Sequence, residues 1–197
     1  MKKFSDLKPF TKEWFTNYWF YFKWHTIAVL FVLILVVSTI VEVVNRENPD
    51  YQIGLVAAFP FAEEFKGELK EKLEISIDDI NNDDKKIVQF LDVTTSAAPQ
   101  DEMQMAASQK LFLEFSAGDT FIYIMDKELY QMYDEQDIFQ KIKGEETAIP
   151  VSEIDFFKDM DVYNSDNLVL CMRHLRQKEK ISVDNAHKLL DIILSAY

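Results

Sequence analysis

The stretch Phe20–Val44, FYFKWHTIAVLFVLILVVSTIVEVV, determines how the rest of the chain must be organised. No residue within 27–41 is charged, and two valines continue the apolar run beyond the single Glu42. The run of about 18 residues is close to the length that a helix needs to cross the hydrocarbon core of a bilayer. A helix buried in a protein core normally keeps a polar stripe, and this one has none. We therefore predict a transmembrane helix over residues 25–45.

A cleaved signal peptide is the main alternative. Its cleavage site would follow a shorter apolar region and would carry small residues such as Ala. The residues that leave the apolar run, STIVEVVNRENPD (38–50), include Ile, Val and Glu instead. We therefore expect the helix to remain as an anchor. Pro49 lacks an amide donor, so the helix should end near it and a short stalk should occupy residues 46–50.

The charges on the two sides of this helix differ in sign. Five lysines and two acidic residues precede it, for a net charge of +3, whereas the chain from Asn45 onward has 16 basic and 31 acidic residues, for a net charge of −15. Positively charged flanks are retained in the cytoplasm. We therefore expect a single-pass protein of the cell membrane with a cytoplasmic N-terminus and an extracellular C-terminal domain.

Residues 1–24 end in an aromatic segment, WFTNYWFYFKW (14–24). Aromatic rings with a polar edge settle at the level of the lipid headgroups, and lysines extend toward the phosphates. A cytoplasmic, interfacial helix that leads into the span is therefore predicted. Its expected contacts with the bilayer are Trp14, Tyr18, Trp19, Tyr21, Lys23 and Trp24. An aromatic face that binds a partner is the alternative.

Residues 51–197 have the length of one domain with a single core. Four segments rich in β-branched and aromatic residues predict strands. They are residues 50–59, 86–93, 120–125 and 167–173. Two segments in which apolar residues repeat every four positions predict amphipathic helices. The repeating residues are Phe61, Phe65, Leu69 and Leu73 in one, and Met103, Ala107, Leu111 and Phe115 in the other.

The remaining segments predict two more helices and a loop. The helices are expected over residues 127–142 and 182–197, and the loop over residues 144–152. Strands that alternate with helices through short connections favour a parallel sheet. We therefore predict an α/β fold, in which the transmembrane helix precedes a small three-layer domain with a mostly parallel sheet.

Right-handed crossovers place the carboxyl ends of such strands at one edge of the sheet. We expect a partner or a ligand to be contacted at this edge. The residues that the strand ends bring there are Phe59, Phe61, Thr94, Thr95, Asp126 and Glu128.

The acidic turn before the second strand, DINNDDK, is a candidate cation site. Asp79, Asn81 and Asp83 occupy the first, third and fifth positions of a calcium-binding loop, where oxygen ligands alternate. Asp84 stands where such a loop needs glycine, and Phe90 stands where it needs a bidentate Glu. A hydrated turn between a helix and a strand is the competing interpretation.

No combination of residues indicates an enzyme or a cofactor site. The chain has no G-x-S-x-G or H-E-x-x-H motif, and its four glycines are too few for a phosphate-binding loop. Cys171 is alone, which excludes an intramolecular disulfide, and pairs of acids such as Glu63 and Glu64 carry little information in so acidic a chain. A net charge of −13 disfavours nucleic acid as a partner.

One basic run interrupts the acidic domain. Its residues are Arg173, His174, Arg176, Lys178 and Lys180. The run could contact a partner or lipid headgroups, or it could be a solvated turn.

The order of these pieces over about residues 50–175 resembles the first lobe of bacterial extracellular solute-binding proteins. The resemblance rests on IGLVAAF (53–59), on DINNDDK (79–85) and on SAGD (116–119) before a strand that ends in Asp. The turn departs from the D-x-N-x-D-G-K form common in that family, because Asp84 replaces the glycine. Family members clamp their ligand between two lobes, so the resemblance implies only half of a binding cleft here. The N-terminal helix takes the place of the lipid-attachment cysteine usual in the family.

These observations predict a non-catalytic accessory protein whose extracellular domain docks another membrane or surface protein. One alternative is a ligand sensor or transporter-associated receptor, which would bind a small solute in a cleft completed by a second chain. Another is a cell-surface hydrolase, which would need two carboxylates roughly 5 to 10 Å apart in one pocket.

Overall fold

The computed structural model describes residues 11–45, 49–142, 144, 146–174 and 180–195. The chain divides into two compact units, Met1–Glu47 and Asn48–Tyr197. Most of the predicted stalk, residues 46–48, lies outside the described residues.

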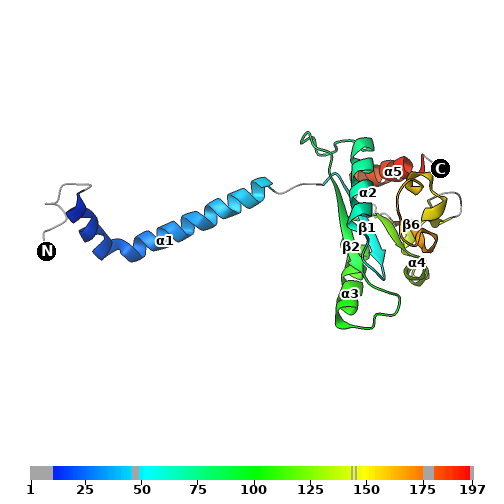
Figure 1. Cartoon of the computed structure of the whole chain (residues 1–197), viewed down its shortest axis with the longest axis horizontal. Helices are drawn as coiled ribbons and strands as arrows, with labels where there is room; N and C mark the ends of the chain where they lie inside the picture. Colours follow the sequence, from blue (N-terminus) through cyan, green and yellow to red (C-terminus); the bar gives the residue numbers. More distant parts are fainter. Residues whose placement is uncertain (1–10, 46–48, 143, 145, 175–179, 196–197) are drawn as a thin grey trace. The chain divides into compact units, whose positions relative to one another are not determined.

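Helix α1 (Lys12–Asn45) provides the regular structure of the first unit (Figure 1). Its segment Trp14–Val41 is long and apolar enough to cross a membrane, and none of its most apolar window is buried. A core helix of a soluble domain would be mostly buried, so the structure disfavours that alternative. A signal sequence meets the same criteria of length and composition.

The aromatic segment is continuous with the apolar part of α1, which bends near its N-terminal end (Figure 1). Trp14, Tyr18 and Phe22 stack along one face, with 5.4 Å between neighbouring ring centroids. The Tyr18 hydroxyl lies 2.9 Å from Oγ1 of Thr26. The other predicted contact residues, Trp19, Tyr21 and Trp24, have rings that are more than half exposed, and Lys23 is exposed as well. Their contact with a bilayer stays a prediction.

The second unit is built on a mixed β-sheet. Its strands in the described residues are β1 (Tyr51–Ala57), β2 (Val88–Thr94), β3 (Ile122–Asp126), β4 (Phe139–Gln140), β5 (Ala148–Pro150) and β6 (Leu168–Arg173). The strands follow the order β2-β1-β3-β6-β4, and β5 also pairs with β6. β1 is parallel to β2 and β3, whereas β6 is antiparallel to β3, β4 and β5. The α/β class is confirmed, but the parallel arrangement is limited to β1, β2 and β3.

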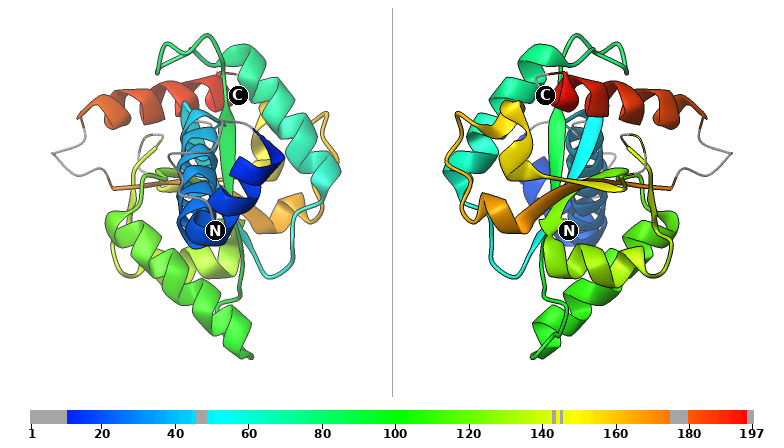
Figure 2. Two further views of the ribbon diagram at one scale, coloured as in Figure 1. Left: turned by 90° about the vertical axis from the view of Figure 1, so that its left-hand side faces the viewer. Right: turned by 90° about the vertical axis from the view of Figure 1, so that its right-hand side faces the viewer.

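Helices cover both faces of this sheet (Figure 2). They are α2 (Glu63–Ser76), α3 (Glu102–Ala117), α4 (Lys127–Asp134) and α5 (Lys180–Leu194), with short 3₁₀ helices η2 (Val151–Glu153), η3 (Asp155–Phe157) and η4 (Ser165–Asn167). One hydrophobic cluster joins the sheet to α2 and α5, and a second joins it to α3 and α4. Successive strand residues alternate between the clusters, as Ile124 and Met125 do. The predicted three layers are therefore present.

The crossover helices explain where a site can form. Helix α2 connects β1 to β2 on one face, and α3 connects β2 to β3 on the opposite face. The chain leaves the carboxyl end of β1 into α2 on one face and the carboxyl end of β3 into α4 on the opposite face. Such a reversal opens a crevice outside the strand ends of an open α/β sheet.

The helix predicted over residues 127–142 is half as long in the structure. Leu129 and Tyr133 are buried, but the next position in their four-residue repeat is Asp137. Asp137 adopts a φ of +56°, and the chain then enters β4, where Phe139 is buried. The apolar face needed to continue the helix ends at Tyr133.

The loop predicted over residues 144–152 contains regular structure. Ile149 is buried in β5, and Val151 is buried in η2. Three residues suffice for a strand here because β6 offers an open pairing partner. The strand ends at Pro150, where the missing amide donor is tolerated.

Candidate functional site

The carboxyl ends of β1 and β3 are joined by a side chain. Oδ2 of Asp126, the last residue of β3, accepts a hydrogen bond of 2.6 Å from the backbone amide of Ala58, which follows β1. This contact lies at the place where the crossover helices diverge. It fixes the path of the chain into the segment Phe59–Ala62.

Asp126 is buried, and its second carboxylate oxygen, Oδ1, has no hydrogen-bond partner among the described residues. Burial raises the pKa of this carboxyl, the Ala58 amide lowers it, and the nearby charge of Glu128 raises it. Glu128 itself is exposed. Of these two predicted contact residues, only Glu128 has its side chain at the surface.

Thr94, the last residue of β2, and Thr95, which follows it, also differ in exposure. Thr94 is exposed, whereas Thr95 is fully buried. The Thr95 hydroxyl donates to the Gln104 carbonyl at 3.1 Å and lies 2.7 Å from the Ser108 hydroxyl. These contacts hold the loop after β2 against α3, so Thr95 has a structural role at this edge.

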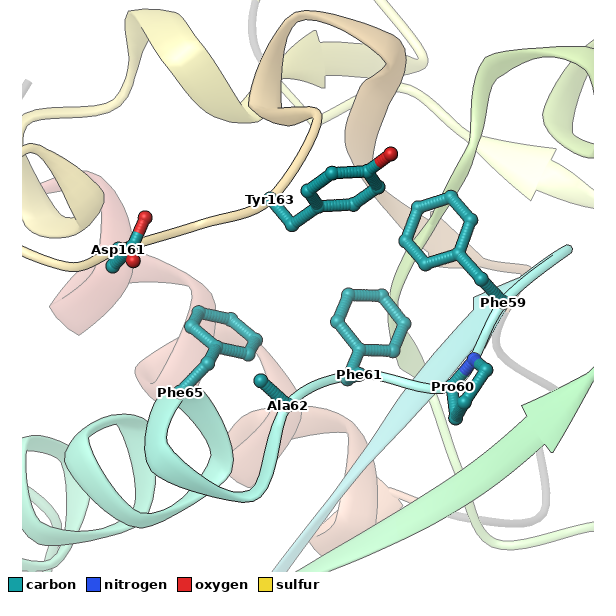
Figure 3. A pocket seen from close by; sticks show the side chains of 7 residues that line it. All are labelled: Phe59, Pro60, Phe61, Ala62, Phe65, Asp161 and Tyr163. Carbon is teal, nitrogen blue, oxygen red and sulfur yellow. The ribbon is translucent and has the colours of Figure 1, made fainter.

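An aromatic pocket lies beside the end of β1 (Figure 3). Its volume is ≈ 470 Å³. It is lined by Phe59, Pro60, Phe61, Ala62, Phe65, Asp161 and Tyr163. We call this the aromatic pocket. Two of its residues, Phe59 and Phe61, were predicted from the sequence as contact residues at the sheet edge.

The rings of the pocket are held by one another. The Phe59 and Tyr163 rings meet edge to face, with centroids 5.0 Å apart. The Phe61 and Phe65 rings stack with centroids 5.7 Å apart. Phe61 and Phe65 are buried and anchor the wall, whereas Tyr163 is 72% exposed. The pocket therefore has two buried rings in its wall and one exposed aromatic side chain, Tyr163, at its rim.

Sequence reasoning missed Asp161 and Tyr163. They come from the segment between η3 and η4, which no periodic pattern links to β1. Asn164, next to Tyr163, has a φ of +57°. The string Tyr-Asn-Ser-Asp (163–166) is a turn signal that could have placed Tyr163 at the surface, but not beside Phe59.

One carboxylate lines this pocket, and two more lie next to a lining residue in sequence. Asp161 contributes to its lining, and Glu63 and Glu64 occupy the first turn of α2 directly after Ala62. Lys66 is close by, but its ammonium contacts Glu63 at 2.6 Å and Asp92 at 2.9 Å. These two contacts raise the pKa of Lys66.

In the candidate cation turn, the side-chain oxygens accept hydrogen bonds from backbone amides of the same turn. Asp79 accepts hydrogen bonds from the amides of Asn82 and Asp84, Asn81 accepts one from Asp83, and Asp83 accepts one from Lys85. Asn82 and Asp84 have φ values of 57° and 62°. The amides therefore already use oxygens that a cation would need. A calcium site at Asp79, Asn81 and Asp83 stays a prediction.

Asp50 ties this turn to the start of β1. Its Oδ1 accepts hydrogen bonds from the amides of Ile80 at 2.8 Å and Asn81 at 3.2 Å, and its Oδ2 accepts one from Ile87 at 2.9 Å. Sequence reasoning did not single out this residue.

The basic run does not form one exposed island. Arg173 is 2% exposed. Its guanidinium donates to the carbonyls of Thr120 at 3.0 Å and Gly118 at 2.6 Å and lies over the Phe121 ring at 4.5 Å. Arg173 therefore stabilises the turn before β3. His174 is exposed and lies 3.6 Å from Asp137, while residues 175–179 lie outside the described residues.

The remaining candidates for reactive or metal-binding groups are the lone cysteine and the clustered acids. Cys171 is fully buried in β6, and burial raises the pKa of its thiol well above the usual value. No group of three or more His, Cys, Asp or Glu side chains is placed to hold a metal ion within the described parts of the chain.

No known protein family, no curated protein and no solved structure matches this chain. The fold and the pocket define an α/β domain with an aromatic pocket at the carboxyl edge of its parallel strands, preceded by an apolar helix long enough to span a membrane.

Proposed function

We propose that this chain is a non-catalytic, single-pass membrane protein whose second unit docks a membrane or surface partner as an accessory subunit. The single observation that carries this proposal is the aromatic pocket at the end of β1. Aromatic side chains are enriched at protein interfaces, and Tyr is enriched among the residues that anchor a partner. The resemblance to one lobe of a solute-binding protein points to the same edge of the sheet.

The proposed topology is N-terminus inside and acidic unit outside. Helix α1 supports an anchor through its length and its unburied apolar surface. The charge difference across the predicted span 25–45, +3 before it and −15 from Asn45 onward, supports the orientation.

Site-specific photo-crosslinking in cells tests the docking proposal. A photoreactive phenylalanine analogue would replace Tyr163, which is 72% exposed at the rim of the pocket. Ile75, which is 75% exposed near the end of α2, provides a control position of similar exposure away from the pocket. We expect a discrete adduct of higher mass from position 163 and none from position 75. Equal labelling at both positions, or recovery of this chain alone from solubilised membranes, would contradict the proposal.

A second candidate function is a ligand sensor or receptor. The volume of ≈ 470 Å³ favours it, because small-molecule pockets span about 300–1,000 Å³. A small solute in the pocket would raise the melting temperature of the purified chain. This rise should disappear in Tyr163→Ala and persist in Ile75→Ala.

A further inference from the structure

The lining residues of the aromatic pocket indicate the chemical class of its ligand more closely than its volume does. Four aromatic rings and the carboxylate of Asp161 line it. Ring faces carry negative electrostatic potential and attract cations, and a nearby carboxylate adds to that attraction. An apolar ligand would use the rings alone and would gain nothing from Asp161.

The segment that supplies Asp161 is also negatively charged as a whole. Residues 153–166, which supply Asp161 and Tyr163, contain five acidic residues and one basic residue, Lys158. Lys158 forms an ion pair with Asp155. In α2, Lys66 pairs with Glu63 and Asp92. Lys158 and Lys66, which flank the lining residues in sequence, are therefore both paired with acids.

The N-terminus of α2 also lies at the pocket and could in principle favour an anion. Its cap residue, Ala62, supplies no side-chain hydrogen bond to the helix. However, Glu63 and Glu64 occupy the first turn, where carboxylates offset the positive end of a helix dipole. An anionic ligand would meet these two acids as well as Asp161.

The same domain holds two of its own cations against aromatic rings. The Lys72 ammonium lies 4.5 Å from the centre of the Phe156 ring, and the Arg173 guanidinium lies 4.5 Å from the centre of the Phe121 ring. In the aromatic pocket, rings and a carboxylate are present without such an internal cation among the lining residues.

We infer that the aromatic pocket receives a basic side chain, Arg or Lys, from a peptide segment of the docked partner. This inference deepens the proposed function and rests on it. The cation would lie among the aromatic rings of the pocket and would pair with Asp161. The strongly acidic second unit would attract a basic segment from a distance and speed its association.

Selection from a random dodecapeptide phage library tests this inference. The target is the full chain in phosphatidylcholine nanodiscs, and empty nanodiscs remove peptides that bind lipid. Selected peptides are then measured against wild type, Tyr163→Ala, Asp161→Asn and Ile75→Ala. All three substituted side chains are exposed, so these variants should fold.

We expect Arg and Lys to be enriched at least threefold in the selected peptides. Binding should weaken about tenfold in Tyr163→Ala and in Asp161→Asn and stay unchanged in Ile75→Ala. Replacing the key Arg of a peptide by citrulline, which is neutral and of nearly the same shape, should also weaken binding about tenfold.

The outcomes separate this inference from the proposed function. Peptides that depend on Tyr163 but bind equally with citrulline would overturn the cationic assignment and leave the pocket as a docking site. A selection without any peptide that depends on Tyr163 would contradict both. If free arginine or choline stabilises the chain and no selected peptide depends on Tyr163, the pocket binds a solute. That result would overturn the inference that it binds a partner.

Discussion

Asp126 is the residue whose ionisation should affect the stability of the second unit. Burial raises its pKa, so the folded state favours the protonated carboxyl. A raised pKa contributes stability that is complete below the ordinary Asp pKa of 3.8 and is lost as the pH rises through the higher folded value. Asp126→Asn removes this titration and retains an oxygen that can accept the Ala58 amide. We therefore expect the unfolding free energy of the variant, relative to wild type, to increase from about pH 3.5 to about pH 7.

Urea unfolding followed by far-UV circular dichroism measures this difference. Tryptophan fluorescence is unsuitable, because Trp14, Trp19 and Trp24 all lie in α1. Glu153→Gln, which changes an exposed acid, serves as the control for the loss of one charge. Identical pH profiles for Asp126→Asn and wild type would contradict the prediction.

Gly54 is a second residue whose substitution should change the stability of the second unit. It pairs with Tyr123 in the register of β1 and β3, and a Cβ at position 54 would lie 2.2 Å from the Tyr123 ring. Gly54→Ala should therefore reduce the unfolding free energy by about 1–3 kcal/mol, the usual effect of overpacking. Tyr123→Leu in the same chain should recover part of that loss, and a double-mutant cycle would measure the coupling.

Gly67 provides the control for Gly54. It lies in α2, where a Cβ at position 67 would meet no atom within 4 Å. Gly67→Ala should stabilise the helix by about 0.5–1 kcal/mol, because alanine is the better helix former. Similar destabilisation by both alanines would show that the ring contact is not the cause.

At the scale of the elements, α3 shows what periodicity can and cannot predict. The four-residue repeat correctly predicts that Leu111 and Phe115 face the core. It wrongly includes Met103, which is 84% exposed because the first turn of α3 projects beyond the sheet (Figure 2). Repeats in sequence define a helix face but not the length of sheet available to cover it.

Substitutions in α3 test this difference in burial between Leu111 and Met103. Leu111→Ala should reduce the unfolding free energy by about 2–5 kcal/mol, because it leaves a cavity beneath a fully buried side chain. Met103→Ala should change it by less than about 0.5 kcal/mol. Chemical denaturation of both variants tests the pair, and a large loss in Met103→Ala would mean that the first turn is covered.

The other elements likewise separate into those that a local sequence pattern predicts and those that depend on tertiary pairing. Strands β1, β2 and β3 and helices α2 and α3 were predictable, because each carries its own apolar period and the connections between them are short. β4 and β5 were not, because strands of two and three residues have no period and exist only through pairing with β6. The position of Asp137 in the helical repeat was the signal for the early end of α4.

For the whole molecule, the sequence predicted one wall of the candidate site. Phe59 and Phe61 follow a recognisable strand, so their place at the carboxyl edge could be derived. Tyr163 reaches them from a segment about a hundred positions later in the chain, and only the tertiary fold brings the two together. The burial of Asp126 and Thr95 likewise depends on packing that no local pattern encodes.

The topology of the whole chain can be tested in cells. Five lysines before the predicted span 25–45 and the acidic unit after it predict that protease added to intact cells digests the second unit. A tag at the N-terminus should stay protected until the membrane is permeabilised, and carbonate at high pH should not release the undigested chain. A second unit protected in intact cells and digested only after permeabilisation would reverse the orientation. Release of a shorter chain that begins after α1 would instead identify α1 as a cleaved signal sequence. In either case a partner would have to be sought in a different compartment or without membrane tethering, so this experiment should precede the search for one.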